Sequence, residues 1–180
     1  MLEETPFQRL QAIEADCLAH AAGLPRMEEP GEDWLALAVN IGEHSVLVPL
    51  EEVGEIASVP SLTRVPRAPA WVKGIANIRG DVVPLFDLSR FLGGPATPWR
   101  SEARVLITTV DRSRIGFVIG RSLGLRRFDV NEIRPPGSHP GELDAFLEGE
   151  VADTRRSWPV FSLHRVVGQA DFAELAGRAV

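Results

Sequence analysis

The fold is decided by one stretch, Trp71–Gly93, which reads WVKGIANIRGDVVPLFDLSRFLG. β-Branched and aromatic residues lie on both sides of Gly80 and Asp81, and a glycine accepts the positive φ of a tight turn without a Cβ clash. The stretch therefore predicts a β-hairpin. Directly after it, Asp87 is placed to cap the N-terminus of a short helix, and Gly93 to end that helix.

The pattern of this stretch returns later in the chain. The segments that correspond are Pro84–Gly93 with Pro159–Gly168, Trp71–Gly74 with Phe146–Gly149, and Thr63–Pro66 with Ile133–Pro136. Matched segments in the same order indicate a duplicated β-unit. The alternative is that strand-to-helix junctions in general draw on similar residues.

Helices are predicted at both ends of the chain. Thr5 has the residue type of a helix start, Gly23 that of a helix end, and apolar residues recur between them at helical spacing. An acidic linker follows, so we expect residues 1–33 to form an N-terminal helix and linker. A second short helix is predicted over 171–179.

From Trp34 onwards the sequence predicts mainly β structure. Short apolar alternations mark strands that are buried on one face, and turn signals separate them. The glycine- and proline-rich segment 94–98 divides this region into the approximate halves 34–94 and 95–170. Each half has about five predicted short strands, which is enough for a small closed barrel. Closure also removes exposed sheet edges.

Composition excludes several functional classes. A length of 180 residues and a hydrophobic share of 44% suit one globular domain or two joined half-domains. A formal net charge of −6 gives no basic footprint for nucleic acid. No apolar run approaches the ~20 residues that span a membrane, and no signal-peptide pattern is present. We therefore expect a soluble, cytoplasmic protein that neither binds nucleic acid nor inserts into a membrane.

Residues for catalysis or metal binding are sparse. The four histidines are widely separated and lack the spacing of metal ligands. The one cysteine, Cys17, has no nearby basic residue that would activate it as a nucleophile. The glycines within 116–124 come without a phosphate-loop pattern. The sequence therefore predicts no enzyme, no cofactor and no metal site, and it favours a binding module.

One resemblance makes this expectation more specific. The motif of Trp71–Gly80, followed by Val83–Leu88, closely resembles the signature of the CheW family of chemotaxis coupling proteins. The segment Leu50–Ile56 is similar to the family's acidic segment upstream. The resemblance covers about residues 34–168 and identifies 34–180 as a CheW-like domain. It implies two intertwined, SH3-like, five-stranded β-barrel subdomains around a shared hydrophobic core.

The resemblance also implies partners and binding sites. Members of the family are non-enzymatic adaptors in membrane-associated arrays, where they bridge the cytoplasmic tips of chemoreceptors and the regulatory domain of a CheA-type histidine kinase. A receptor groove between the halves, floored by glycines that let a helix approach, is expected at Val53, Glu55, Gly74, Arg79 and Gly116. A kinase contact is expected at Ile41, Val46, Val48, Gly80, Pro136 and His139.

A finer resemblance concerns the N-terminal region. Thr5–Leu10 and Ala21–Pro25 resemble the extension of PilI-type adaptors, which serve chemosensory systems that control type IV pili and twitching motility. One alternative is a flagellar chemotaxis coupling protein. A less favoured alternative, of another class, is a small-ligand-binding β-barrel whose pocket is lined by Trp71, Phe86, Trp99 and Trp158.

Two positions depart from the family pattern. Ser162 stands where the family often has an acidic residue after the last strand, so that Asp87 is not mirrored in the second half. The loop Pro135–Gly141 is rich in proline and carries His139 where an apolar residue is common. The second departure lies in a region that the family uses for kinase contact.

Glu55 and Arg79 each lie in an otherwise apolar run and match charged positions of the family motif. An isolated charge is costly to bury, and a planar guanidinium suits a fixed carboxylate. We therefore expect the two side chains to pair, with the strand of Glu55 beside the hairpin of Arg79. The pair is interpreted either as a brace of the groove wall or as a contact to a partner.

Overall fold

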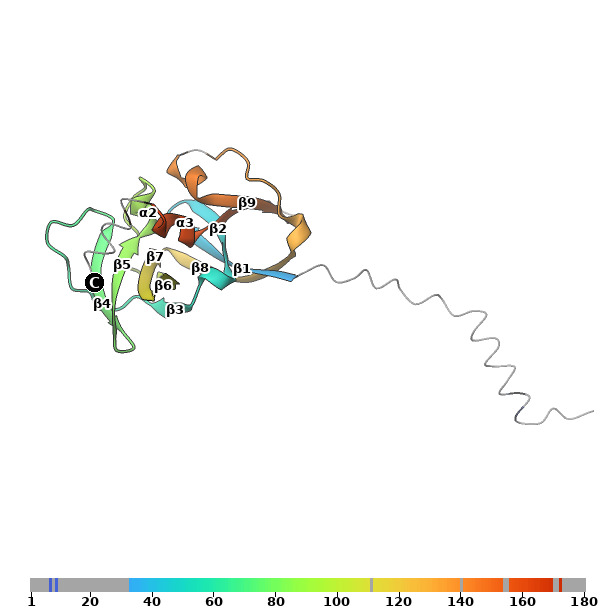
Figure 1. Cartoon of the computed structure of the whole chain (residues 1–180), viewed down its shortest axis with the longest axis horizontal. Coiled ribbons are helices and arrows are strands. Elements are labelled where there is room, and N and C mark those ends of the chain that lie inside the picture. Colours follow the sequence, from blue (N-terminus) through green and yellow to red (C-terminus); the bar gives the residue numbers. More distant parts are fainter. Residues whose placement is uncertain are drawn as a thin grey trace, which may run out of the picture. The chain divides into compact units, whose positions relative to one another are not determined.

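The computed structural model describes Phe7, Arg9 and residues 33–110, 112–139, 141–153, 156–169 and 172 (Figure 1). The chain divides into two compact units, Met1–Gly31 and Glu32–Val180. Of the predicted N-terminal helix, Phe7 and Arg9 are described, and both are helical. The rest of that helix lies outside the described residues, as does the predicted C-terminal helix apart from Phe172.

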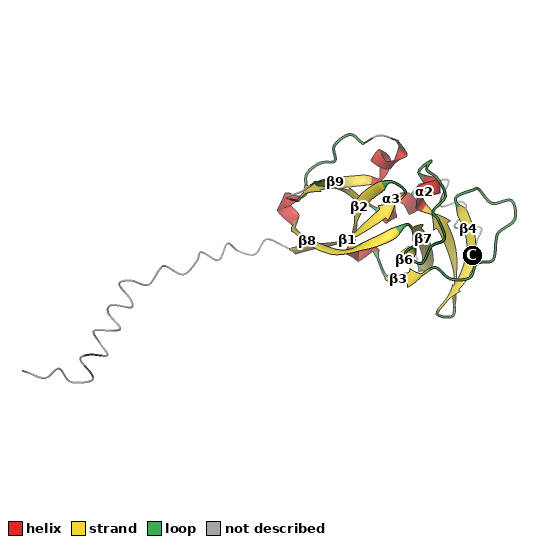
Figure 2. Cartoon of the chain, turned by 180° about the vertical axis from the view of Figure 1, so that it is seen from behind, coloured by secondary structure: helices red, strands yellow, loops and turns green. Residues whose placement is uncertain are grey.

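The second unit consists mainly of strands with a few short helices (Figure 2). The strands are β1 (Asp33–Ile41), β2 (His44–Pro49), β3 (Glu55–Ser58), β4 (Val72–Ile78), β5 (Asp81–Asp87), β6 (Arg104–Val110), β7 (Ser113–Ile119), β8 (Arg121–Asp129), β9 (Leu147–Ala152) and β10 (Ser157–Phe161). The helices are α2 (Leu88–Phe91), α3 (Leu163–Val167) and the 3-10 helices η1 (Leu50–Glu52), η2 (Val130–Glu132) and η3 (Glu142–Phe146).

The stretch that decides the fold forms the predicted hairpin and capped helix. Strands β4 and β5 pair in antiparallel register up to Ile78 and Asp81. Arg79 and Gly80 between them both have positive φ, at 55° and 97°, as a tight hairpin turn requires. The Asp87 carboxylate accepts a hydrogen bond from the Arg90 N–H and so caps α2. These local predictions are confirmed.

The ten strands form two five-stranded sheets, and each sheet mixes the two halves of the sequence. Hairpin β1–β2 joins three later strands in the order β8-β1-β2-β10-β9, which we call barrel A. Hairpin β6–β7 joins three earlier strands in the order β3-β6-β7-β5-β4, which we call barrel B. Residues 34–94 and 95–170 thus each supply five strands, but the halves exchange their first hairpins and become intertwined.

A further pairing brings the edges of each sheet together. Thr63, after β3, bridges to Ile75 of β4, and Arg134, after β8, bridges to Glu150 of β9. These bridges pair backbone groups that an open edge would expose. The predicted fold class is confirmed, because the structure is mainly β and holds two SH3-like barrels.

Alternation along the strands sorts the apolar side chains into three clusters. The interior of barrel A contains Ala36, Ala38, Leu47, Val151, Trp158 and Val160. The interior of barrel B contains Ala76, Ile78, Val83, Leu85, Val105, Ile107 and Val118. The opposite faces of both hairpins meet in a shared core, whose buried members include Leu37, Val39, Phe86, Leu106, Phe117, Phe161 and Phe172.

The two barrels correspond position by position, which confirms the duplication. Leu85 of β5 pairs in parallel with Gly116 of β7, and Val160 of β10 pairs in parallel with Leu47 of β2. Leu85 and Val160 are also matched in the sequence alignment of Pro84–Gly93 with Pro159–Gly168. The duplicated unit is therefore visible in strand pairing as well as in sequence.

Candidate protein-binding surfaces

Exposed apolar side chains mark one candidate surface. Ile56 of β3 and Leu125 of β8 are 42% and 59% exposed. The two positions are equivalent, because Ile56 pairs with Leu106 and Leu125 with Leu37, which lie at matching places in hairpins β6–β7 and β1–β2. Both of these neighbours are buried in the shared core. Ile56 and Leu125 thus extend the outer apolar faces of the two barrels to the surface.

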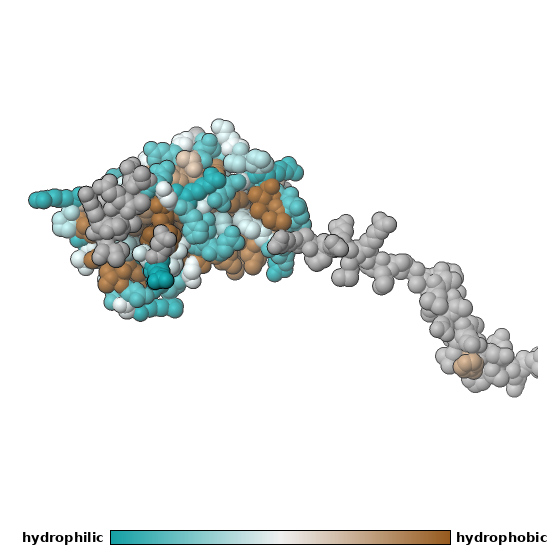
Figure 3. Space-filling view, in the orientation of Figure 1, coloured by the Kyte–Doolittle hydropathy of each residue, from teal (hydrophilic) through white to brown (hydrophobic). Residues whose placement is uncertain are grey.

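A shallow hollow of about 340 Å³ is lined by Asp33, Trp34, Leu35, Leu50 and Glu51. Leu35 lies on the same face of β1 as Leu37, the pairing partner of Leu125. Val53, directly after η1, packs against the shared core and remains partly exposed. We call Leu35, Leu50, Val53, Ile56 and Leu125 the apolar margin. Figure 3 shows that apolar residues reach the surface of the second unit in patches among hydrophilic ones. Apolar anchors with the nearby carboxylates of Asp33 and Glu51 have the chemistry that an amphipathic helix requires.

The predicted receptor-site residues lie in three different environments. Val53 belongs to the apolar margin, whereas Glu55 and Arg79 form an ion pair at one end of barrel B. Gly74 and Gly116 are buried. The prediction that these two glycines form the floor of an open groove is wrong.

Internal packing explains the two buried glycines. A Cβ at Gly116 would meet the Leu85 side chain and would lie 2.9 Å from Val105 Cγ1, inside barrel B. A Cβ at Gly74 would collide with the Thr63 carbonyl, where the closing segment crosses β4. Both positions need glycine because other parts of the barrel come too close for a side chain. A larger side chain such as that of Gly116→Trp would therefore disrupt barrel B.

The predicted kinase-contact residues separate into a buried and an accessible set. Ile41, Val46 and Val48 are fully buried in the shared core, so the prediction that they contact a partner directly is wrong. A single barrel would leave this hairpin face open, but the second barrel covers it. Gly80 is exposed at the tip of the β4–β5 hairpin, Pro136 is exposed, and His139 is half-buried in the loop after β8.

A network of two arginines and two carboxylates lies at one end of barrel B. The Arg79 Nε lies 3.0 Å from Glu55 Oε1, which confirms the predicted pair. The Arg114 guanidinium donates to Glu55 Oε2 at 2.8 Å and to Asp81 Oδ2. The hydrogen bond to Asp81, together with the charges of Asp81 and Glu55, raises the pKa of Arg114 above its usual value. β3, the β4–β5 hairpin and β7 are therefore linked electrostatically.

The two arginines contribute unequally to this network. The Arg79 side chain is 78% exposed, whereas that of Arg114 is 25% exposed. An exposed ion pair contributes little, so Arg114 is the stronger brace and Arg79 is free to face a partner. The sequence does not single out Arg114, because a charge in the turn-proximal part of a strand is ordinary.

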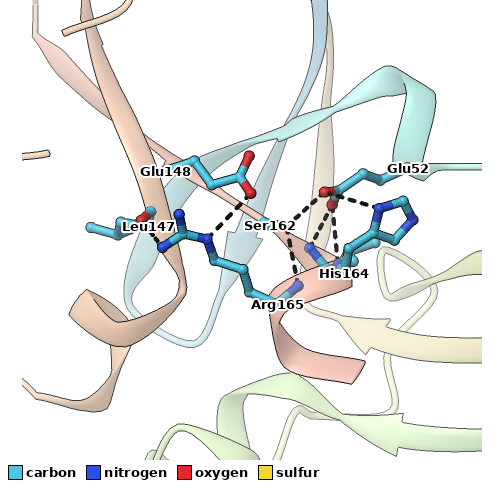
Figure 4. Close-up of polar contacts among 7 residues, drawn as sticks. Glu52, Leu147, Glu148, Ser162, His164 and Arg165 are labelled. Carbon is cyan, nitrogen blue, oxygen red and sulfur yellow. Dashed lines mark hydrogen bonds and ion pairs between the residues drawn. The ribbon is translucent and has the colours of Figure 1, made fainter. Parts of the chain in front are cut away.

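A second polar site surrounds Glu52, a residue outside the predicted sites (Figure 4). Its buried carboxylate accepts hydrogen bonds from Ser162 Oγ and the Leu163 N–H, both at 2.6 Å, and from the His164 N–H at 3.4 Å. The His164 Nδ1 lies 3.5 Å from the same carboxylate. Glu52 therefore supplies the carboxylate at the start of α3 that Ser162 lacks.

The equivalent site at α2 uses a carboxylate of its own. Asp87 is fully buried, and besides capping α2 it accepts hydrogen bonds from the Thr97 N–H at 2.8 Å and the Thr97 hydroxyl at 2.6 Å. Lys73 Nζ lies 2.7 Å from Asp87 Oδ2, which balances the buried charge. The departure at Ser162 thus changes where the carboxylate comes from and keeps a carboxylate at the helix start.

The aromatic residues of the ligand-binding alternative do not line a common pocket. Trp71 and Phe86 pack on one another at the shared core, with ring centroids 5.6 Å apart. Trp158 fills the interior of barrel A, and Trp99 is 48% exposed. Within the described residues, no group of His, Cys, Asp and Glu side chains could hold a metal ion. No described helix has the length and apolar character needed to cross a membrane.

Comparisons with known proteins agree with these features. The model of the CheW-like domain matches residues 35–171. The chain is 34% identical to protein PilI of Pseudomonas aeruginosa over 176 residues, which is 96% of this chain and 97% of that protein. It is 34% identical to protein FrzA of Myxococcus xanthus over 66% of this chain and 73% of FrzA.

A solved structure supports the same fold. The scaffolding protein TtCheW from Thermoanaerobacter tengcongensis superposes with a TM-score of 0.68 at 21% identity, over 77% of this chain and 95% of that one. The chain therefore belongs to the CheW-like family, whose members are coupling adaptors of chemosensory systems. Among its relatives it is similar to the PilI type along nearly its whole length.

Proposed function

We propose that the protein is a non-enzymatic adaptor that couples methyl-accepting chemoreceptors to a CheA-type histidine kinase in a system that controls type IV pili and twitching motility. The observation that carries this proposal is the 34% identity with PilI over 96% of the chain. In this role the protein acts in the cytoplasm and is recruited to membrane-associated arrays. It needs no cofactor.

The apolar margin is the proposed receptor contact. A chemoreceptor tip presents helices, and an amphipathic helix binds through apolar anchors with a polar rim. Ile56 and Leu125 extend the two barrels to the surface, and Leu35 and Leu50 share one cavity. Glu55 is the first residue of β3, the strand that carries Ile56, and its partner Arg79 lies in the β4–β5 turn. The exposed guanidinium of Arg79 thus adds a polar contact near this end of β3.

The regulatory domain of the kinase is proposed to bind elsewhere on the surface. Of the residues expected for this contact, Gly80, Pro136 and His139 remain accessible. The loop of Pro136 is anchored to barrel A because the Gly137 N–H donates to Glu150 Oε2 at 3.2 Å. Gly80 follows Arg79 in the β4–β5 turn and so borders the receptor rim, whereas Pro136 and His139 lie in the loop after β8. These two residues are the proposed centre of the kinase contact, because a coupling adaptor must bind both partners at once.

The test measures binding of the full chain to a receptor-tip fragment and to the kinase regulatory domain in separate titrations. Leu125→Asp should weaken receptor-tip binding at least about tenfold, because a charge replaces an apolar anchor, and should leave kinase binding unchanged. Val130→Asp is the matched control, since Val130 is also exposed but lies outside the apolar margin. Equal loss in both variants would contradict the proposed receptor surface.

The pilus branch needs its own measurement. The kinase regulatory domains of a pilus system and of a flagellar system, taken from the same organism, should be compared for binding to the full chain. We expect tighter binding to the pilus-type domain. Preference for the flagellar domain would assign the protein to flagellar chemotaxis instead.

A further inference from the structure

Glu52 lies between two residues of the apolar margin, Leu50 and Val53, but its side chain is buried while theirs reach the surface. Its carboxylate binds the start of α3 through Ser162 and the next two backbone N–H groups (Figure 4). Helix α3 is held in turn by Arg165, whose guanidinium donates to the Leu147 carbonyl at 2.9 Å and to Glu148 at 3.3 Å. Glu52 therefore connects the apolar margin to α3, which Arg165 holds against β9 of barrel A.

The same short segment is also tied to barrel B. Residues 50–54 lead from β2 of barrel A to β3 of barrel B. Within the segment, the Val53 N–H donates to the Leu50 carbonyl at 3.0 Å. At its end, the Gly54 N–H donates to the Ile107 carbonyl of β6 at 2.8 Å. The positions of Leu50 and Val53 thus depend on two anchors, Glu52 toward α3 and Gly54 toward β6.

The equivalent helix shows that capping alone does not require this arrangement. Asp87 caps α2 from its own N-cap position. Ser162 already caps α3 in this way, because its hydroxyl accepts a hydrogen bond from the Arg165 N–H. An aspartate at residue 162 would keep that cap and place a carboxylate at the helix start without Glu52. In this chain the carboxylate instead belongs to the segment that carries Leu50 and Val53. The helix start and the margin are thereby coupled through one side chain.

We propose that Glu52 is a positioning residue for receptor docking, which holds Leu50 and Val53 in the arrangement that a receptor helix binds. The inference rests on the proposed function, because it assumes that the apolar margin is the receptor surface. Preorganisation of a binding surface raises affinity by reducing the ordering cost of association. Loss of the Glu52 anchor should therefore weaken receptor binding beyond what loss of helix capping explains.

The test separates these two roles of Glu52 with a pair of variants. Glu52→Ala should destabilise the protein and weaken binding of a receptor-tip fragment about tenfold, which corresponds to ~1.4 kcal/mol. The double variant Glu52→Ala with Ser162→Asp restores a carboxylate to α3 from its own N-cap position but leaves the margin unanchored. We expect it to regain stability in urea unfolding and to keep the weakened receptor binding. Recovery of both properties together would overturn the proposal.

A second measurement needs no partner. Native-state hydrogen exchange should show faster exchange of the Val53 and Gly54 amides in Glu52→Ala, beyond the change at amides in the centre of β6 and β7. Uniform acceleration at all of these amides would overturn the positioning role, even if the double variant fails to regain stability. Glu132→Gln is the matched control, since Glu132 is the exposed third residue of η2 as Glu52 is the buried third residue of η1.

The two measurements also distinguish this inference from the proposed function. If the wild-type protein does not bind the receptor-tip fragment, the proposed receptor surface is wrong, and hydrogen exchange alone decides whether Glu52 anchors residues 50–54. If wild-type binding is present and the double variant binds equally well, the proposed function stands and the role of Glu52 is limited to capping.

Discussion

Barrels A and B share one topology but distribute side-chain volume in opposite ways. At equivalent interior positions, barrel A has Trp158, Leu47, Ala36 and Ala38 where barrel B has Val83, Gly116, Val105 and Ile107. The bulky side chains of barrel A lie on β10 and β2, opposite alanines on β1. In barrel B, β6 carries the larger residues and faces the glycine of β7. A duplicated backbone can thus be filled by two complementary sets of side chains.

This difference shows why a residue of one barrel cannot be copied into the other. Protein interiors are close-packed, so adding or removing even one methylene group changes the stability of the fold. The tryptophan of barrel A has room because Ala36 and Ala38 face it, and Gly116 is needed because Leu85 and Val105 occupy its side-chain space. Substitutions that exchange interior residues between the barrels should therefore destabilise both.

The largest effect is expected for Trp158→Val, which places the barrel B residue in barrel A. The substitution leaves a cavity and also removes the stack on Arg156, 3.4 Å from the ring centroid, and the hydrogen bond to Asp153. We expect a loss of about 3 kcal/mol or more in the free energy of unfolding, measured by urea denaturation. Trp99→Val, at an exposed tryptophan, should cost much less. Equal losses would show that the interior of barrel A is not close-packed.

A smaller loss is expected for Gly116→Ala, which adds one methyl group to the interior of barrel B. Because the new Cβ meets the Leu85 and Val105 side chains, overpacking should cost about 1–3 kcal/mol of unfolding free energy. Shortening the obstructing side chain by Leu85→Val in the same protein should make the double variant lose less than the sum of the two single losses. Strict additivity in this double-mutant cycle would contradict the steric explanation.

The polar ends of the barrels give the next test. Arg114→Ala removes two charge-assisted hydrogen bonds from a mostly covered guanidinium, and we expect a loss of about 1–2 kcal/mol in thermal or urea unfolding. Arg79→Ala removes a largely exposed ion pair and should cost ~0–1 kcal/mol. Receptor binding should respond in the reverse order, with the larger loss for Arg79→Ala. If Arg79→Ala lost more unfolding free energy than Arg114→Ala, Arg79 and not Arg114 would be the main brace.

Local features of the fold could be predicted because their signals are contiguous in sequence. The Gly80 turn and the Asp87 cap follow from residue types within a few positions, and the duplication from matched segments. The exchange of hairpins could not be predicted, because the parallel pairs Val160–Leu47 and Leu85–Gly116 join residues far apart in the chain. The residues of a hairpin do not indicate which distant strand will pair with it.

The same limit applies to the candidate sites. Glu55 and Arg79 could be paired from sequence since each interrupts an apolar run. The predicted kinase contact at Ile41, Val46 and Val48 is wrong because the second barrel buries a hairpin face that a single barrel would expose. Glu52 was missed because its helix-capping role depends on Ser162, more than a hundred residues away. Ser162 is the available signal, because it caps α3 with a hydroxyl where the family pattern often has an acid.

The smallest effect concerns the segments that close the two barrels. In barrel A, the pKa of Glu150 lies below its usual 4.5. The hydrogen bond from Ser157 lowers it most, and the Gly137 N–H and the nearby His139 lower it further. The equivalent bridging residue of barrel B, Ile75, cannot titrate. Because the folded-state pKa is depressed, the contribution of Glu150 to stability is complete above pH ~4.5 and is lost as the pH falls through the lowered pKa.

The closing loop of barrel A should therefore respond to acid while that of barrel B does not. In NMR pH titrations we expect the Gly137 amide to shift with a midpoint below 4.5, and the Thr63 and Ile75 amides to stay constant over the same range. Glu150→Gln should abolish the Gly137 transition and should reduce stability at neutral pH, with the difference from wild type shrinking in acid. A Gly137 midpoint above 4.5, or a matching transition at Ile75, would show that Glu150 does not distinguish the two closures.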